Sequence, residues 1–232
     1  CIKQAFEARP FEAHPTVRAY AWLTDAVVRA VFDTATLHLH PLQYPTTGER
    51  LAVLAVGGYG RCEMAPHSDV DLLFLSPYKL TGWAESVIES MLYMLWDLRL
   101  KVGHASRTVK DCLRLGREDL TIRTSLLETR AICGDRDLAT ELDDALWAQL
   151  FTGTEAEFIE GKLQERESRH IKQGGQRYVV EPNVKEGKGG LRDLQTLFWV
   201  AKYTHRVEKV RELVAHGVFT PEEYETFRSA DE

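Results

Sequence analysis

The stretch that most constrains the fold of this chain is residues 51–75, LAVLAVGGYGRCEMAPHSDVDLLFL. It contains two apolar runs, each the length of one buried strand, and a connection that begins at Gly57 and Gly58. Asp69 and Asp71 open the second run, and residues two apart on a strand point to the same face of the sheet. The sequence therefore predicts two strands, a glycine turn between them, and a carboxylate pair suited to clamp a divalent metal.

Hydrophobic spacing around this stretch predicts a small mixed α/β sheet. Helices are expected at residues 16–39 and 84–98, and strands at residues 51–56, 70–75 and 100–108. The second helix is apolar almost all round, which indicates that it packs on the sheet and is covered by other elements. The order strand, turn, strand, helix, strand is typical of a small α/β domain.

The chain becomes helical after this sheet. A short element is expected to end at Gly134, and Thr220-Pro221 has the sequence of a helix start. We divide the chain into an amino-terminal helical segment, an α/β core and a helical region, at residues 1–48, 49–140 and 141–232. The further segments expected are helices at 113–127, 137–150, 155–172 and 191–205, an extended segment at 176–184 and a loop at 185–190.

Composition excludes several classes of function. The net charge of −6 argues against a general nucleic-acid-binding protein, because such proteins usually carry a basic excess. No apolar run is long enough to predict a membrane span. Scattered cysteines without a CxxC pair favour reduced thiols in the cytoplasm over disulfides or a zinc site. These cysteines are Cys1, Cys62, Cys112 and Cys133, and the start at Cys1 rather than Met predicts a fragment of a longer protein.

The glycine turn matches neither of two common nucleotide-binding patterns. Glu63 stands where a dinucleotide fingerprint needs its third glycine, and no Gly-Lys-Ser/Thr follows, as a P-loop requires. A tight turn from strand to loop is the plain alternative. Bare backbone N–H groups at such a turn are nevertheless able to cradle a polyphosphate.

The aspartate pair has a chemical interpretation and a plain one. Leu73 and Phe74 follow it, which excludes a calcium loop of the EF-hand type. The plain alternative is a capping aspartate and a strand-end aspartate, each solvated. Two like charges at the start of a buried strand, however, repel each other unless a cation joins them. Magnesium accepts carboxylates together with water and substrate phosphates, so the combination predicts metal-dependent phosphoryl or nucleotidyl transfer.

These residues also resemble a known family. Residues 56–73, V-G-G-Y-G-R-x-E-x-x-P-x-S-D-V-D-L-L, resemble the bacterial PII uridylyltransferase/uridylyl-removing enzymes, within the DNA polymerase β-type nucleotidyltransferase superfamily. The resemblance extends to residues 95–108, 124–135 and 180–203. It implies that residues 49–140 form a nucleotidyltransferase core and that the helical region contributes a nucleotide-contacting loop.

The resemblance implies a role for each residue of the motif. Gly57 and Gly58 would hold the triphosphate of UTP, and Ser68 would add a hydroxyl contact. Asp69 and Asp71 would be the catalytic residues and would bind Mg²⁺. In such a site one ion lowers the pKa of the attacking hydroxyl and another neutralises the leaving pyrophosphate. The attacking hydroxyl would belong to a tyrosine of a PII signal protein.

Basic residues complete the set of candidate nucleotide ligands. Arg61 would pair a phosphate bidentately, with a surface arginine as the plain alternative. Lys185, Lys188 and Arg192 accompany a glycine-rich loop that enters a helix, where free N–H groups favour an anion. The alternatives for this region are a flexible linker with a helix cap, and Asp193 as a first-turn acid that complements the helix dipole.

The superfamily commonly has a third carboxylate on a neighbouring strand, and the strand expected at residues 100–108 carries none. Glu128 and Asp97 are the alternatives for this role. Each also has a plain alternative as a salt-bridged or helix-terminal acid. His104, in the same strand, is interpreted as a structural histidine in preference to a nucleotide ligand.

Two competing functions stay open at this point. An adenylyltransferase of glutamine synthetase shares the glycine turn and the aspartate pair, but it fits residues 102–108 and 181–193 less well. A catalytically silent nucleotide-sensing module is the other alternative, and the intact aspartates argue against it. Full-length members of the resembled family also have an HD-type hydrolase domain and glutamine-sensing ACT domains, which this fragment is expected to lack.

Overall fold

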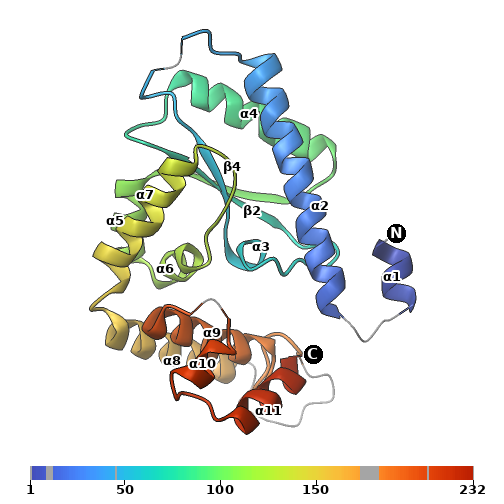
Figure 1. Ribbon diagram of the computed structural model, residues 1–232, viewed down its shortest axis with the longest axis vertical. Coiled ribbons are helices and arrows are strands. Elements are labelled where there is room, and N and C mark those ends of the chain that lie inside the picture. Colours follow the sequence, from blue (N-terminus) through green and yellow to red (C-terminus); the bar gives the residue numbers. More distant parts are fainter. Residues whose placement is uncertain (1, 9–12, 45, 173–182, 208, 232) are drawn as a thin grey trace. The chain divides into compact units, whose positions relative to one another are not determined.

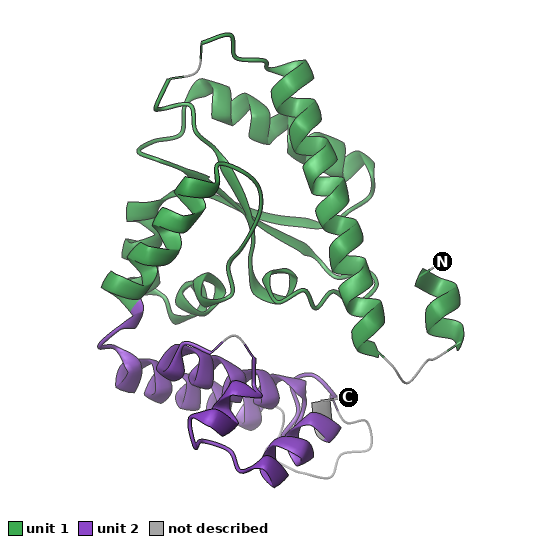
Figure 2. Ribbon diagram, viewed as in Figure 1, with its two compact units in different colours: residues 1–150 green, residues 151–232 purple. Residues whose placement is uncertain are grey.

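The computed structural model divides the chain into two compact units, Cys1–Leu150 and Phe151–Glu232 (Figure 2). Where a nucleotidyltransferase domain begins and ends within the chain stays a prediction. Among the described residues, no helix combines the length and apolar character that crossing a membrane requires. The structure describes residues 2–8, 13–44, 46–172, 183–207 and 209–231.

A mixed sheet with the strand order β3-β2-β1-β4 forms the centre of the first unit (Figure 1). β1 is antiparallel to both β2 and β4, whereas β2 and β3 are parallel. The predicted mixed α/β fold is therefore confirmed, and the short element expected to end at Gly134 is the edge strand β4. The strands are β1 (Ala52–Ala55), β2 (Val70–Ser76), β3 (Val102–Thr108) and β4 (Arg130–Gly134).

Helices cover the two faces of this sheet. Val70, Leu72 and Phe74 of β2 pack in one apolar cluster with residues of α2 (Ala13–Asp33) and α4 (Gly82–Asp97). The alternate residues of β2 point to the opposite face, where α7 contacts the sheet. Both faces of β2 are thus covered, which explains its nearly continuous apolar sequence. The helices that follow β3 and β4 are α5 (Val109–Glu118), α6 (Leu120–Leu127) and α7 (Arg136–Leu146).

Capping residues set the helix boundaries that hydrophobic spacing alone blurred. Asp119 ends α5 and begins α6, because its extended backbone interrupts the helix and its side chain accepts bonds from the Thr121 and Ile122 N–H groups. The segment at residues 113–127, where at least one helix was expected, consequently contains the end of α5 and the whole of α6. The helix expected at residues 16–39 continues beyond α2 as a π-helical turn, η1 (Thr34–Leu39), and a short helix, α1 (Ile2–Ala8), precedes it.

The second unit is helical, as predicted. The Phe158 ring stacks on the Tyr203 ring at 3.9 Å between centroids, and the Tyr203 hydroxyl lies 2.6 Å from Thr154 Oγ1. Thr220 and Glu223 form the expected reciprocal cap of the last helix, at 2.8 and 3.2 Å. Most of the extended segment expected at residues 176–184 lies outside the described residues. The elements are η2 (Trp147–Phe151), which spans the boundary, α8 (Glu155–Lys172), α9 (Leu191–His205), α10 (Glu212–Ala215) and α11 (Pro221–Asp231).

Candidate active site

The glycine turn and the aspartate pair meet at one edge of the sheet, where β1 ends and β2 and β3 begin. Val56, which follows β1, donates its N–H to the Asp71 carbonyl at 3.1 Å. Asp71 in turn is the register partner of Gly103 on the parallel strand β3. These pairings bring Gly57, Asp71 and Gly103 side by side. We call Gly57, Asp69, Asp71 and Gly103 the carboxylate edge.

The Asp71 carboxylate lies between two glycines. A Cβ atom on Gly57 would lie 3.8 Å from Asp71 Oδ2. A Cβ atom on Gly103 would overlap with Asp71 Oδ1 at a separation that real Cβ atoms do not reach. Gly103 therefore provides the space that the carboxylate occupies. The sequence alone does not reveal this residue, because its relation to Asp71 depends on the pairing register of β2 and β3.

Electrostatics at the carboxylate edge disfavour two negative charges. Burial raises the pKa of Asp71 above the ordinary aspartate value, and the neighbouring charge of Asp69 raises it further. Asp69 is exposed and lies just before β2, whereas Asp71 is half-buried within it. The repulsion expected between them is thus present. A cation bound by both carboxylates would relieve it, so the donor set fits a hard divalent ion.

The glycine turn is a one-turn helix, α3 (Gly57–Gly60). Gly57 has a φ of +59°, a backbone conformation that favours glycine. At a helix start the first N–H groups have no acceptor within the helix. In α3 these groups belong to Gly57, Gly58 and Tyr59, so the turn presents backbone donors next to Asp71 and no side chain from its first two residues.

Arg61 and Glu128 pair with each other. Arg61 Nη1 donates to both carboxylate oxygens of Glu128, at 2.7 and 2.6 Å, and Arg61 Nε donates to Glu63 at 2.8 Å. Glu128 is buried, and the backbone of Gly60 approaches its carbonyl so closely that a Cβ atom would overlap. The pair therefore ties the end of α3 to the end of α6. The roles of Arg61 as a phosphate ligand and of Glu128 as a third acid stay predictions.

The other candidates at this end of the sheet are exposed. Ser68 lies in the turn before Asp69 and donates its N–H to the Ala65 carbonyl at 3.1 Å, and Asp97 is the last residue of α4. β3 carries no acid, as the sequence indicated. Its His104 is on the opposite face of the sheet from Asp71 and packs edge-on against Phe74. Within the described ranges, no group of three or more His, Cys, Asp and Glu side chains is arranged to hold a metal.

The comparisons with known proteins place the chain among relatives of one kind. Bifunctional uridylyltransferase/uridylyl-removing enzymes match nearly the whole chain, with 67% identity over 230 residues in Cereibacter sphaeroides and 63% over 231 residues in Ruegeria pomeroyi. The corresponding enzyme of Erythrobacter litoralis is 54% identical over 230 residues. The matches cover 99%, 100% and 99% of this chain. The family model described as GlnD PII-uridylyltransferase matches residues 157–232.

The chain belongs to this uridylyltransferase family. It spans about a quarter of the length of the curated relatives, 25% of each of these three. The activities that the names of these relatives state belong to much longer proteins.

Within the part matched by the uridylyltransferase family model, Asp193 anchors the loop that precedes α9. It accepts bonds from the Gly189 N–H at 2.8 Å, from His170 Nε2 at 2.9 Å and from Arg169. Burial alone would raise the pKa of Asp193, but these donors lower it below the ordinary value. Asp193 therefore does more than complement the dipole of α9, because it also fastens the loop to α8.

The basic residues of this loop differ in their surroundings. Lys185 and Lys188 are exposed. Arg192 instead donates to Gln195 at 3.0 Å and lies over the Trp199 ring at 5.5 Å. Lys185 and Lys188 thus present their charges to solvent, whereas the guanidinium of Arg192 is held by neighbours. Their contact with a nucleotide stays a prediction.

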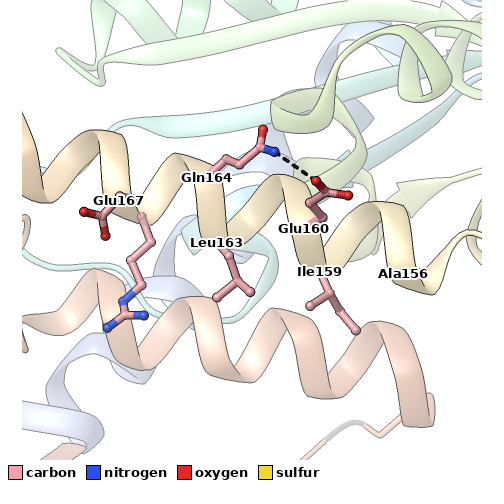
Figure 3. Close-up of a pocket in the computed structure, with 7 residues that line it drawn as sticks. Ala156, Ile159, Glu160, Leu163, Gln164 and Glu167 are labelled. Atoms are coloured by element: carbon pink, nitrogen blue, oxygen red, sulfur yellow. Dashed lines mark hydrogen bonds between the residues drawn. The ribbon is translucent and has the colours of Figure 1, made fainter.

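A shallow depression of about 680 Å³ lies along α8 (Figure 3). The side chains of Ile159 and Leu163 point to one side of this helix, and those of Glu160 and Gln164 to the other, where they share a 3.2 Å hydrogen bond (Figure 3). The depression is lined by one helix, and its lining contains no residue of the carboxylate edge. The depression therefore does not support a catalytic role for these residues.

Proposed function

We propose that this chain transfers UMP from UTP to a tyrosine hydroxyl of a PII signal protein and releases pyrophosphate. The observation that carries the proposal is the carboxylate edge, where a half-buried aspartate lies between two glycines beside the donors of a glycine turn. The names of the relatives, uridylyltransferase/uridylyl-removing enzyme, support uridylyl transfer over adenylyl transfer or a silent sensing module.

Asp69 and Asp71 would hold Mg²⁺ in this proposal. Two carboxylates are enough for magnesium in proteins, because water and substrate phosphates supply its other ligands. When bound, the ion would activate the attacking hydroxyl and neutralise charge on the leaving pyrophosphate. The raised pKa of Asp71 is the observation that fits such an ion, since burial and the negative charge of Asp69 both disfavour the ionised carboxylate.

The chain's own groups would bind and orient UTP. The N–H groups at the start of α3 would donate to phosphate oxygens, and the missing side chains of Gly57 and Gly58 would let the triphosphate approach the backbone. Ser68 would add a hydroxyl contact at the entry of β2. Lys185 and Lys188 carry exposed positive charges that would bind an anionic phosphate, while Arg192 would support their loop.

The transfer itself needs an in-line geometry. The tyrosine oxygen of the PII protein would bond to the α-phosphorus, the bond from this phosphorus to the bridging oxygen would break, and pyrophosphate would leave. The hydroxyl proton would pass to solvent. Holding the two reactants in this alignment is the main contribution that such a site makes.

We also propose a cytoplasmic location, because the described cysteines Cys62, Cys112 and Cys133 are free thiols.

A labelling experiment tests this proposal. The chain is incubated with Mg²⁺, a PII protein and UTP labelled at the α-phosphate, with and without excess unlabelled ATP. A further reaction contains ATP labelled at the α-phosphate in place of UTP. We expect label on the PII protein that resists the ATP competitor and that disappears when the modified tyrosine is replaced by phenylalanine. Label transferred only from ATP would support the adenylyltransferase alternative. An absence of transfer from either nucleotide would contradict the proposal.

A further inference from the structure

A second set of polar contacts joins the glycine turn to α2 and β4. It consists of Asp25 on α2, Tyr59 on α3 and Arg130 at the start of β4, which we call the turn anchor. Asp25 and Tyr59 are buried, with 7% and 2% of their surfaces exposed. The turn anchor joins three elements that are far apart in the sequence.

Asp25 is the centre of these contacts. Its carboxylate accepts a 2.8 Å hydrogen bond from the Tyr59 hydroxyl and a bidentate pair of bonds from Arg130, at 2.7 and 3.0 Å. Arg29 lies 3.6 Å from the same carboxylate. Burial and the adjacent Asp25 raise the pKa of Tyr59, so its hydroxyl stays protonated and remains a donor. Asp25 therefore joins the side chains of Tyr59 and Arg130.

Arg130 also binds the backbone of the glycine turn directly. Its Nη2 donates to the Tyr59 carbonyl and its Nε to the Gly60 carbonyl, both at 3.2 Å. These two residues are the last of α3. The guanidinium lies 5.5 Å from the centroid of the Tyr59 ring. Arg130 thus fixes both the side chain and the carbonyl groups at the end of the turn.

A turn of this kind needs such fixation. A single helical turn is not stable by itself, because nucleating a helix costs more conformational entropy than one hydrogen bond returns. The glycines at its start add backbone freedom, since glycine adopts both positive and negative φ. Gly57 is two residues from Tyr59 and lies beside Asp71. The position of the backbone donors relative to Asp71 therefore depends on contacts made outside the turn.

We propose that Asp25, Tyr59 and Arg130 are positioning residues that hold the backbone donors of Gly57 and Gly58 at the distance from Asp71 required to bind the phosphates of the nucleotide. This inference rests on the proposed function. It makes the turn anchor a determinant of nucleotide affinity and not only of stability. The alternative is a purely structural ion pair, whose loss lowers stability without changing the affinity of the folded molecules.

The test compares two Arg→Lys substitutions in the chain. Arg130→Lys keeps a positive charge but removes the bidentate pairing and the bonds to the two carbonyls. The matched control is Arg50→Lys, because Arg50 forms a similar bidentate pair with Asp135, at 2.6 and 2.8 Å, at the opposite end of β1. UTP affinity with Mg²⁺ is measured by calorimetry, and amide hydrogen exchange is measured on peptides that contain residues 57–63.

For Arg130→Lys we expect a rise in the UTP dissociation constant of roughly tenfold, since a misplacement of about 1 Å in such sites costs up to about 100-fold. We also expect faster exchange at the turn and an unchanged KM for the PII protein. Arg50→Lys should leave the exchange at the turn and the affinity for UTP unchanged. Tyr59→Phe, which removes one hydrogen bond and keeps the ring, should give a smaller change in the same direction.

An unchanged UTP affinity in Arg130→Lys, with or without faster exchange, would overturn the inference, as would an equal loss of affinity in Arg50→Lys. Failure of the proposed function is recognised separately, because it would appear as absent UTP binding and transfer in the unsubstituted chain. The exchange comparison needs no nucleotide. If the proposed function failed, hydrogen exchange would still show whether the turn anchor fixes the turn. The proposed role of the turn anchor in nucleotide binding would then be refuted together with the function.

Discussion

Replacing Gly103 by alanine should displace the Asp71 carboxylate. The new Cβ atom would lie within 3.0 Å of Asp71 Oδ1, whereas non-bonded heavy atoms are most stable at roughly 3.5 to 4.0 Å. The carboxylate must therefore move by about 0.5 Å or more, or β3 must shift away from β2. Because misplacing a catalytic group by ~1 Å lowers rates by about 100-fold, we expect Gly103→Ala to reduce kcat/KM by roughly 10- to 100-fold.

The assay is the rate of label transfer from UTP to the PII protein, measured together with the thermal unfolding temperature. Gly82→Ala is the matched control, since a Cβ atom on Gly82, at the start of α4, meets no atom within 4 Å. It should leave the rate unchanged. Full activity of Gly103→Ala at unchanged stability would refute the argument that Gly103 makes room for Asp71. Equal losses in both variants would show that the effect is not local.

Three further predictions concern stability and reactivity. Because the pKa of Asp71 is raised on folding, the native state binds this proton more tightly than the unfolded chain and loses stability as the pH rises from the unfolded to the folded pKa. Without Mg²⁺, the Asp71→Asn variant should therefore melt no lower than the parent chain at pH ~7, and the difference between the two melting temperatures should shrink below about pH 4. A lower melting temperature of the variant at neutral pH would contradict this. Glu128→Gln leaves the largely covered guanidinium of Arg61 without the carboxylate of Glu128. It should lower the free energy of unfolding by roughly 3 kcal/mol in urea titrations, and a loss too small to measure would show that Glu63 suffices as a partner. Burial raises the pKa of Cys112 to about 12, so iodoacetamide should not alkylate it in the native chain at pH ~8, and its rapid labelling would show that α5 opens.

The elements that local sequence defines were predicted well. The apolar runs around the glycine turn became β1 and β2, and the capping box at Thr220 became the start of α11. The short element that ends at Gly134 could not be given a type from its sequence. It is a strand because it pairs with β1, as Ala52 with Gly134, across a long stretch of chain. That pairing is a tertiary effect that no local pattern encodes.

Some residues of the candidate site were likewise predictable from local sequence, and others depend on tertiary pairing. Asp69 and Asp71 were visible because their spacing and the apolar residues after them are local features. Gly103 was not, since its relation to Asp71 arises from strand register. Asp25 resembled an ordinary polar residue of an amphipathic helix, and its partner Arg130 lies 105 residues away in the sequence.

The pairing of Arg61 with Glu128 could not be predicted from the sequence either. The sequence offered them as a phosphate ligand and a third acid, yet they are separated by 67 residues and pair with each other in the structure. A charged residue near a motif reveals its type but not its partner. Partners are set by the fold.

The central claim is that two carboxylates at the edge of the sheet carry out uridylyl transfer. The most direct test is the double variant Asp69→Asn/Asp71→Asn, assayed by mass spectrometry of the PII protein after incubation with UTP and Mg²⁺. The parent chain should add one uridylyl group to the tyrosine. The double variant should add none, while it melts at the same temperature or higher. Transfer by the double variant at the parent rate would contradict the account.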